Sequence, residues 1–179
     1  MGKVKIIGGA IAGLLGVFLG VAYLQPEDYR VVRSTTTKAP ASAIFSVISD
    51  FHRFPEWSPW ERRDPAMKRI IAGSPASVGS SYSWEGNDEV GSGKMTMVEV
   101  IPDKKIGIKL EFYKPFASEC TTTWAIEESG NETTLTWAMT GKNSGLMSKA
   151  FALVVNMDKM IGQDFDEGLQ KLKSLAEGT

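Results

Sequence analysis

The chain has 179 residues and a formal net charge of −1, with 42% hydrophobic and 23% charged residues, which is typical of a globular protein. This length suits one domain with a short appendage. The balanced charge, without a basic run interleaved with aromatic residues, argues against a nucleic-acid partner. The single Cys120 excludes an intramolecular disulfide, and the single His52 removes most zinc sites and histidine-based catalytic arrangements, so we expect neither metal nor cofactor.

Residues 1–25 are predicted to form an N-terminal membrane anchor, and residues 26–179 the globular domain. Residues 6–24 carry no charge, and these 19 residues are just enough to cross a hydrocarbon core of about 30 Å. Lys3 and Lys5 favour a cytoplasmic N-terminus, with the domain outside the membrane. A cleaved signal peptide is the alternative, but "VAYLQPED" offers no good small-x-small cleavage site.

Glycines in the anchor are spaced for close helix contact. Gly9 with Gly13, and Gly16 with Gly20, each match the Gly-x-x-x-Gly pattern. The spacing allows a weak homodimer through this helix, although a glycine-rich segment produces such matches readily.

The first part of the domain is predicted as a strand, a helix, an irregular segment and a second strand. "YRVVRSTTTKA" is rich in β-branched residues, as strands are. In "APASAIFSVISDF", Pro40 fits a first helical turn, and Ala43, Ile44, Val47 and Ile48 form an apolar face. "HRFPEWSPWERRDP" contains three prolines and predicts a short helix or turn that runs into a loop, before a strand in "MKRIIAG".

Further strands follow, with turns between them. "SSYSWEG" and "GKMTMVEVI" predict a hairpin in which Met95 and Met97 compete with Val98 and Val100 for the inner face, a conflict that a bulge would resolve. "IGIKLEF", "TTTWAIEE" and "TTLTWAMTGK" alternate apolar with polar residues. The pattern indicates an antiparallel sheet with one apolar face and one solvated face.

One long helix is predicted from Leu146 to Ala176. Its apolar residues recur in steps of three or four and form a single stripe, at Met147, Phe151, Val154, Met157, Ile161, Phe165, Leu169 and Leu172. Such a helix and the strands can bury their apolar faces only if the helix lies across a curved sheet. We therefore predict an α+β fold, in which a curved antiparallel sheet of six to seven strands surrounds the long C-terminal helix and leaves a volume between them.

The residues resemble a known family at this point. "APASAIFSVISDFHRFPEWSPW", "VGSSYSWEGNDEVGSGKMTMVEVIP" and "FDEGLQKLKSLAE" are similar to the START/Bet v 1-like (SRPBCC) superfamily, and within it to bacterial proteins of the polyketide cyclase/dehydrase and lipid-transport type. The resemblance covers roughly residues 29–176. It implies a helix-grip fold with a deep hydrophobic cavity that binds lipids, sterols, polyketides or other apolar molecules, without implying one reaction.

Bulky residues on the predicted inner face are the candidate ligand contacts. They are Trp57, Trp60, Tyr82, Trp84, Met95, Met97, Leu110, Phe112, Trp124, Trp137, Met139, Met147 and Phe151. Methionine suits surfaces that accept varied apolar partners, and aromatic residues present large apolar areas. Ordinary core packing is the alternative for each of them.

Acid–base candidates are few. His52 fits a solvated loop better than a proton shuttle, and Glu99 would be a buried acid only if its strand face points inward. "GSGK" lacks P-loop spacing, and no nucleophile elbow is present. Cys120 fits a buried thiol better than a reactive one.

Three hypotheses follow: a membrane-tethered binding or transfer module for an apolar small molecule or lipid, a polyketide cyclase/dehydrase-type enzyme, and an interaction scaffold whose cavity has collapsed. The absence of catalytic motifs favours the first and leaves enzymatic activity open.

Overall fold

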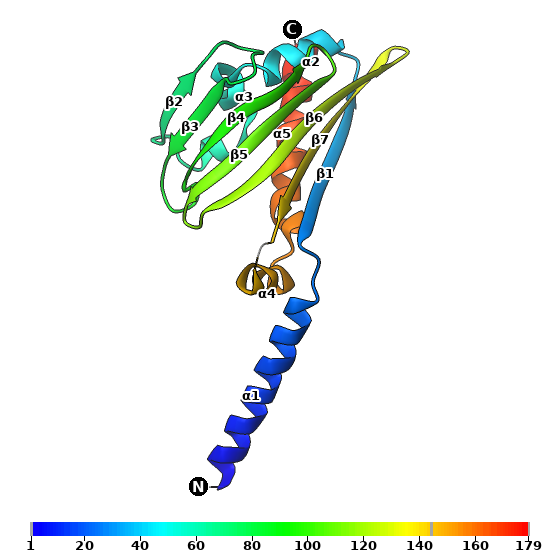
Figure 1. The fold of residues 1–179 in the computed structure, drawn as a ribbon. Coiled ribbons are helices and arrows are strands. Elements are labelled where there is room, and N and C mark those ends of the chain that lie inside the picture. The colour runs from blue at the N-terminus through cyan, green and yellow to red at the C-terminus, as the bar shows by residue number, and fades with distance from the viewer. Residues whose placement is uncertain (1, 144, 179) are drawn as a thin grey trace.

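The computed structural model describes residues 2–143 and 145–178, with side chains described from residue 13 onward. Within these residues, antiparallel strands form one curved sheet in the order β1-β7-β6-β5-β4-β3-β2 (Figure 1). The strands are β1 (Asp28–Thr37), β2 (Lys68–Ala72), β3 (Ser81–Glu85), β4 (Ser92–Ile101), β5 (Lys105–Lys114), β6 (Ser118–Ser129) and β7 (Glu132–Lys142). The helices are α1 (Gly2–Tyr23), α2 (Ala41–Ile48), α3 (Phe54–Trp57), α4 (Leu146–Val154) and α5 (Met157–Glu177), with short 3-10 turns η1 (Phe51–Arg53) and η2 (Pro59–Arg62).

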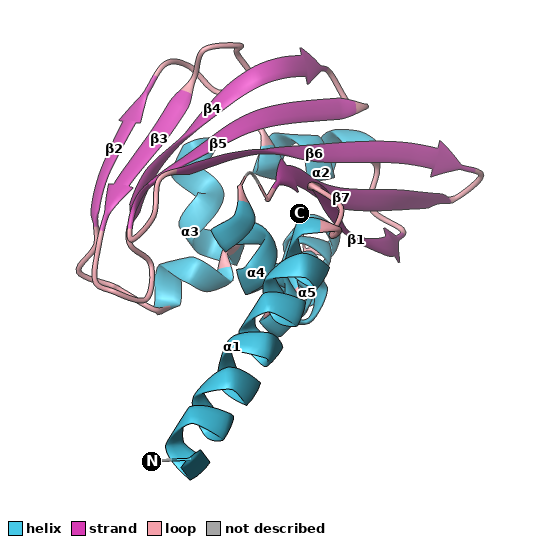
Figure 2. Ribbon diagram, turned by 60° about the horizontal axis from the view of Figure 1, so that its bottom comes forward, coloured by secondary structure: helices cyan, strands magenta, loops and turns pink. Residues whose placement is uncertain are grey.

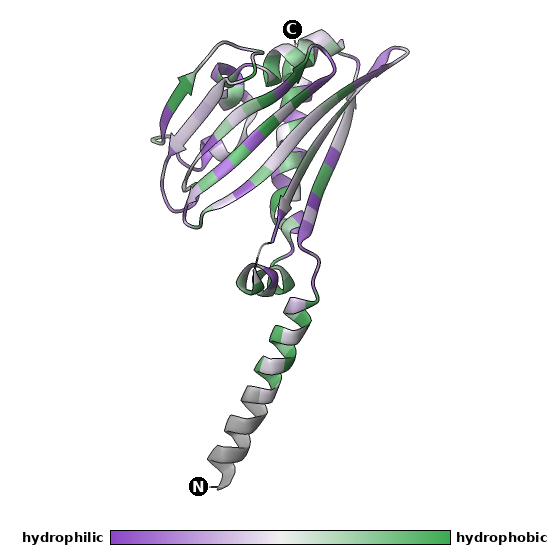
Figure 3. Cartoon of the chain, viewed as in Figure 1, coloured by the Kyte–Doolittle hydropathy of each residue, from purple (hydrophilic) through white to green (hydrophobic). Residues whose placement is uncertain are grey.

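The strands follow the alternation of apolar and polar residues in the sequence (Figure 3). Leu135, Trp137 and Met139 of β7 are buried on the concave face, and their neighbours along the strand are less buried. Trp137 pairs with Trp124 of β6 across the sheet, and the two rings stack with centroids 4.1 Å apart. Because alternate side chains point to opposite faces of a strand, this pairing places the large rings over the concave side.

A β-bulge in β4 resolves the conflict between its methionines and valines. The register with β5 shifts between Met97 and Glu99. Met95 and Met97 are buried, Val98 is exposed, and Val100 packs against the core again. An extra residue at a bulge reverses the phase of alternation, so both halves of the strand contribute inward side chains, as predicted.

The prediction of a single helix from Leu146 to Ala176 is wrong, because the chain forms two helices, α4 and α5. The break falls at residues 155 and 156, where Asn156 caps α5 and its Oδ1 accepts a hydrogen bond from the Lys159 N–H at 3.0 Å. A side-chain oxygen at this position satisfies a backbone donor that a continuous helix would bond internally. The apolar stripe is divided accordingly, since Phe165 of α5 is buried and Phe151 of α4 is exposed.

The N-terminal segment is helical, as α1, and extends away from the sheet (Figure 1). In the described parts of the chain we find no helix with the length and apolar character that crossing a membrane requires. The prediction of a transmembrane helix at residues 6–24 is therefore not supported, although residues 6–12 lie outside those with described side chains.

The sheet is much wider than the helix that it holds. Neighbouring strands lie about 4.8 Å apart, so seven strands span roughly 29 Å, whereas one helix with its side chains is about 10–12 Å across. α5 packs against β1 and β7, and the segment from α2 to η2 packs on α5 and β6 (Figure 2). The predicted helix-grip architecture is confirmed, and the concave face over β3, β4 and β5 lies beyond the reach of α5.

Candidate ligand-binding cavity

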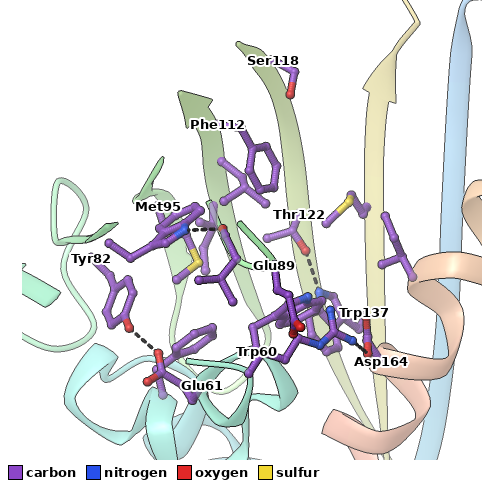
Figure 4. A pocket seen from close by; sticks show the side chains of 18 of the residues that line it. Trp60, Glu61, Tyr82, Glu89, Met95, Phe112, Ser118, Thr122, Trp137 and Asp164 are labelled. Carbon is purple, nitrogen blue, oxygen red and sulfur yellow. Dashed lines mark hydrogen bonds and ion pairs between the residues drawn. The ribbon is translucent and has the colours of Figure 1, made fainter. Parts of the chain in front are cut away.

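A cavity of about 550 Å³ lies between the concave face of the sheet, the segment from α2 to the end of η2, and the first half of α5 (Figure 4). Its volume falls within the range of roughly 300–1,000 Å³ that is common for small-molecule sites. Its wall is formed mainly by apolar and aromatic side chains. From the sequence, the inward side chains could form either a packed core or the wall of a cavity. The structure shows that they do both.

Trp84 and Phe112 form the wall over β3, β4 and β5. The Trp84 indole donates to the Val90 carbonyl at 2.9 Å, and its ring meets Phe112 edge-on with centroids 5.7 Å apart. Gly93 makes room for this ring, because a Cβ at Gly93 would lie 2.4 Å from the Trp84 Cη2 atom. Gly93, near the start of β4, therefore lets the Trp84 ring lie against the strand beside the cavity.

A second aromatic group forms the wall nearest to α5. Trp137 stacks on Phe165 with centroids 3.8 Å apart, and Trp57 and Trp60 meet the Trp137 ring edge-on. Gly168 allows α5 to approach so closely, since a Cβ there would lie 3.0 Å from the Trp137 ring. Interlocked rings leave each other few alternative rotamers, so this wall is closely packed.

A buried carboxylate lines the cavity at η2. Glu61 is 6% exposed, accepts a hydrogen bond from the Tyr82 hydroxyl, and pairs with the Arg69 Nε at 2.7 Å. Burial and the Glu61 carboxylate raise the pKa of Tyr82 above its usual value. Because both oxygens of Glu61 have a partner, the carboxylate is compensated inside an apolar region.

A second ion pair links the loop after η2 to α5. The Arg63 Nη2 atom lies 2.5 Å from the Asp164 Oδ1 atom, and both residues line the cavity. Burial raises the pKa of Asp164, and the Arg63 guanidinium opposes that rise. Glu89, in the turn between β3 and β4, lines the same cavity and is exposed.

The structure brings ten of the thirteen predicted ligand contacts onto one cavity wall: Trp57, Trp60, Tyr82, Trp84, Met95, Leu110, Phe112, Trp124, Trp137 and Met139. Met97 does not line it, and its side chain packs within the core. Met147 and Phe151 do not line it either, because the break before α5 places them on α4, where they are 80% and 58% exposed.

Several lining residues were missed by sequence reasoning. Glu61 and Arg63 lie in the proline-rich segment, where no periodic pattern tells which side chains point inward. Asp164 adjoins the apolar stripe of its helix, and its position on that helix was the only signal available. Met157, Ile161 and Ile108 belonged to apolar patterns that could have identified them.

The remaining chemical candidates lie elsewhere. His52 lies in η1 rather than in a loop. It is exposed, as expected, and its Nδ1 atom lies 2.9 Å from an Asp50 carboxylate oxygen. Glu99 is paired with Lys105 at 2.8 Å and is partly exposed, so it is not a buried acid. Cys120 is buried, and this burial raises the pKa of its thiol to about 11.

A curved sheet that grips a C-terminal helix over an apolar cavity defines the class of helix-grip proteins. The family described as polyketide cyclase / dehydrase and lipid transport matches residues 28–177, and the chain belongs to this family. The resemblance predicted from the sequence is thereby confirmed. A comparison with curated proteins gave no match.

Solved structures with the same fold are distant in sequence. Protein MLL2253 from Mesorhizobium loti is 16% identical with a TM-score of 0.62, over 84% of this chain and 98% of that one. Protein CV1439 from Chromobacterium violaceum is 14% identical with a TM-score of 0.59, over 86% of this chain and 99% of that one. The di-domain ARO/CYC protein StfQ from the steffimycin biosynthetic pathway is 11% identical with a TM-score of 0.59, over 85% of this chain and 51% of its own. At these identities the likeness concerns the fold alone.

Proposed function

We propose that the protein binds or transfers an apolar small molecule, lipid-like or polyketide-like, in the cavity between the sheet and α5. The observation that carries this proposal is an interior space of about 550 Å³ with a mainly apolar and aromatic wall. Transfer of apolar surface from water into such a space is favourable by about 25 cal/mol per Å². A scaffold with a collapsed cavity is disfavoured, because its interior would be filled.

A cyclase/dehydrase-type enzyme is the second candidate, and one observation favours it. Glu61 is a buried carboxylate at the cavity and bonds to the Tyr82 hydroxyl, so the pair could move a proton to or from a bound ligand. Its ion pair with Arg69 equally suits a structural role, in which Glu61 fastens η2 to β2. Replacement Glu61→Gln would abolish turnover of a polyketide-like substrate if Glu61 is an acid–base group.

We further propose that the domain is held at a membrane by apolar side chains of α1 and α4. Leu14, Leu15 and Val17 of α1 are more than half exposed, as are Met147 and Phe151 of α4. Lys149 joins the two helices, since it pairs with Glu27 at 3.2 Å and lies over the Tyr23 ring. Large exposed apolar patches mark interaction or membrane surfaces, and an amphipathic helix can lie in the membrane interface.

Two alanine variants test the binding proposal. Trp84→Ala removes a large part of the cavity wall, whereas Met97→Ala removes a side chain of the adjacent packed core. We expect Trp84→Ala to weaken binding of the neutral fluorescent probe Nile red by about tenfold or more. Met97→Ala should lower the free energy of unfolding by about 2–5 kcal/mol and leave probe affinity nearly unchanged in the folded fraction.

Equal probe affinity in the wild type and Trp84→Ala would contradict the proposal. Native mass spectrometry of the purified protein with extraction into organic solvent gives a second test, since a co-purifying apolar mass identifies the ligand class.

A further inference from the structure

Charged groups at the cavity wall are nearly all committed to partners. Glu61 forms an ion pair with Arg69, and Arg63 forms one with Asp164. The Lys114 Nζ atom lies 3.7 Å from the Glu85 Oε1 atom. Among the residues that the structure describes, no ion pair engages the Glu89 carboxylate. The acidic lining residues Glu61, Glu89 and Asp164 outnumber the basic ones, Arg63 and Lys114.

This arrangement disfavours a negatively charged ligand. A carboxylate or phosphate bound at Arg63 would have to compete with Asp164, and Glu89 adds another carboxylate to the lining of the same cavity (Figure 4). A charge left unpaired in an apolar site costs several kcal/mol unless the group becomes neutral. Lys114 is well exposed, so solvent and salt weaken its attraction for an anion.

An uncharged hydroxyl group fits the same place. It can donate to a carboxylate oxygen of Asp164 or Glu89 and accept from an N–H of Arg63 without breaking the existing ion pair. Trp60, Trp137 and Ile161 provide apolar wall beside these groups for the body of the ligand.

We propose that the cavity selects a neutral, hydroxyl-bearing lipid, of the class of long-chain alcohols and monoacylglycerols, and rejects fatty-acid anions and phosphorylated lipids. The polar end of this lipid lies at Arg63, Asp164 and Glu89. The inference rests on the binding function proposed above and specifies its ligand class.

Displacement of Nile red from the full-length protein tests this selection. The competitors are 1-dodecanol and ionised dodecanoate, which share a chain length and differ in the charge of the head group. Dodecanol is kept below its solubility limit, and dodecanoate below its critical micelle concentration. We expect dodecanol to displace the probe at a concentration about tenfold lower than dodecanoate, because the head group of dodecanoate adds a negative charge to a cavity already lined by the carboxylates of Asp164 and Glu89.

Glu89→Gln and Asp88→Asn make a matched pair for the same titration. Both remove one negative charge from the same turn, but only Glu89 lines the cavity. Glu89→Gln should reduce the preference for dodecanol by about threefold, and Asp88→Asn should leave it unchanged. The effect of Glu89→Gln should shrink at high salt.

Two results would overturn this inference alone: dodecanoate displacing the probe as well as dodecanol does, or a dodecanol preference that both variants leave intact. Failure of Nile red and of both competitors to bind at all would overturn the binding function together with it.

Discussion

Tyr82 and Glu61 are two polar residues that lie in the mainly apolar wall of the cavity. Tyr82 is 1% exposed, and its hydroxyl bonds to a carboxylate that is itself buried. Each group satisfies a polar atom that would otherwise lack a partner away from water. A hydroxyl and a carboxylate can therefore stand in an apolar interior without opening it to solvent.

Tyr82→Phe should lower the free energy of unfolding by about 1–3 kcal/mol, because it leaves one oxygen of the buried Glu61 without its donor. Urea denaturation measures this change. Tyr113→Phe is the control, since Tyr113 is 53% exposed and should change stability by less than about 0.5 kcal/mol. Equal effects of the two variants would show that the Tyr82 hydrogen bond is not a stabilising one.

Cys120 should react slowly with iodoacetamide in the folded protein. The thiolate is the nucleophile, and burial raises the pKa of this thiol to about 11, so little thiolate forms near neutral pH. The alkylation rate should rise as the pH approaches 11. The free energy of unfolding should fall as the pH rises from about 9 to about 11, because the thiol ionises more readily in the unfolded chain than in the fold. Mass spectrometry of the alkylated protein follows the rate, and complete labelling at pH 7 at the rate of the unfolded chain would contradict this expectation.

At the scale of elements, the junction between α4 and α5 controls which apolar residues reach the cavity. Asn156 ends one helical run and begins the next, so Met157 and Ile161 face the cavity while Met147 and Phe151 stay outside. Arg33 of β1 reinforces the start of α5, because its guanidinium bonds to the Asp158 carboxylate at 2.8 Å. The hydrogen bond to Arg33 lowers the pKa of Asp158.

Asn156→Ala should destabilise the protein by about 0.5–2 kcal/mol through the loss of the helix cap. Asn156→Asp keeps a side-chain acceptor at this position and should retain most of the stability. Thermal unfolding followed by circular dichroism measures both variants. Identical unfolding temperatures for wild type and Asn156→Ala would argue that α5 does not depend on this cap.

For the whole molecule, the decisive quantity is the mismatch between a wide sheet and one narrow helix. α5 covers the sheet near β1 and β7, and the segment from α2 to η2 closes part of the remainder. The concave face of β3, β4 and β5 stays uncovered, and the curvature of these strands makes it one wall of the cavity (Figure 2). The helices α1 and α4 lie at the far side from the C-terminus of α5 and present apolar side chains there (Figure 1).

Phe151→Glu in the full chain should reduce co-sedimentation with phosphatidylcholine vesicles severalfold, because it places a charge in the apolar face proposed to contact the membrane. Ile70→Glu is the matched control, since Ile70 is 70% exposed on β2 at the edge strand of the sheet. A loss of vesicle binding in the control that equals the loss in Phe151→Glu would contradict a specific role for α4.

Local patterns determined much of this protein. The strands, the bulge of β4 and the inward positions of Trp124, Trp137 and Met139 follow from alternation, because successive side chains of a strand must point to opposite faces. Three stretches of the sequence also resemble the superfamily, and the family match over residues 28–177 confirms that resemblance.

Only the tertiary structure shows which polar residues line the cavity and where the C-terminal helical segment is interrupted. Glu61, Arg63 and Asp164 come together from an irregular segment and a distant helix, and no periodicity relates residues that meet only through packing. Met147 and Phe151 continue the helical pattern in sequence, but the cap at Asn156 separates them in space. Periodicity reports which face of an element is apolar, whereas the partner of that face is set by the whole fold.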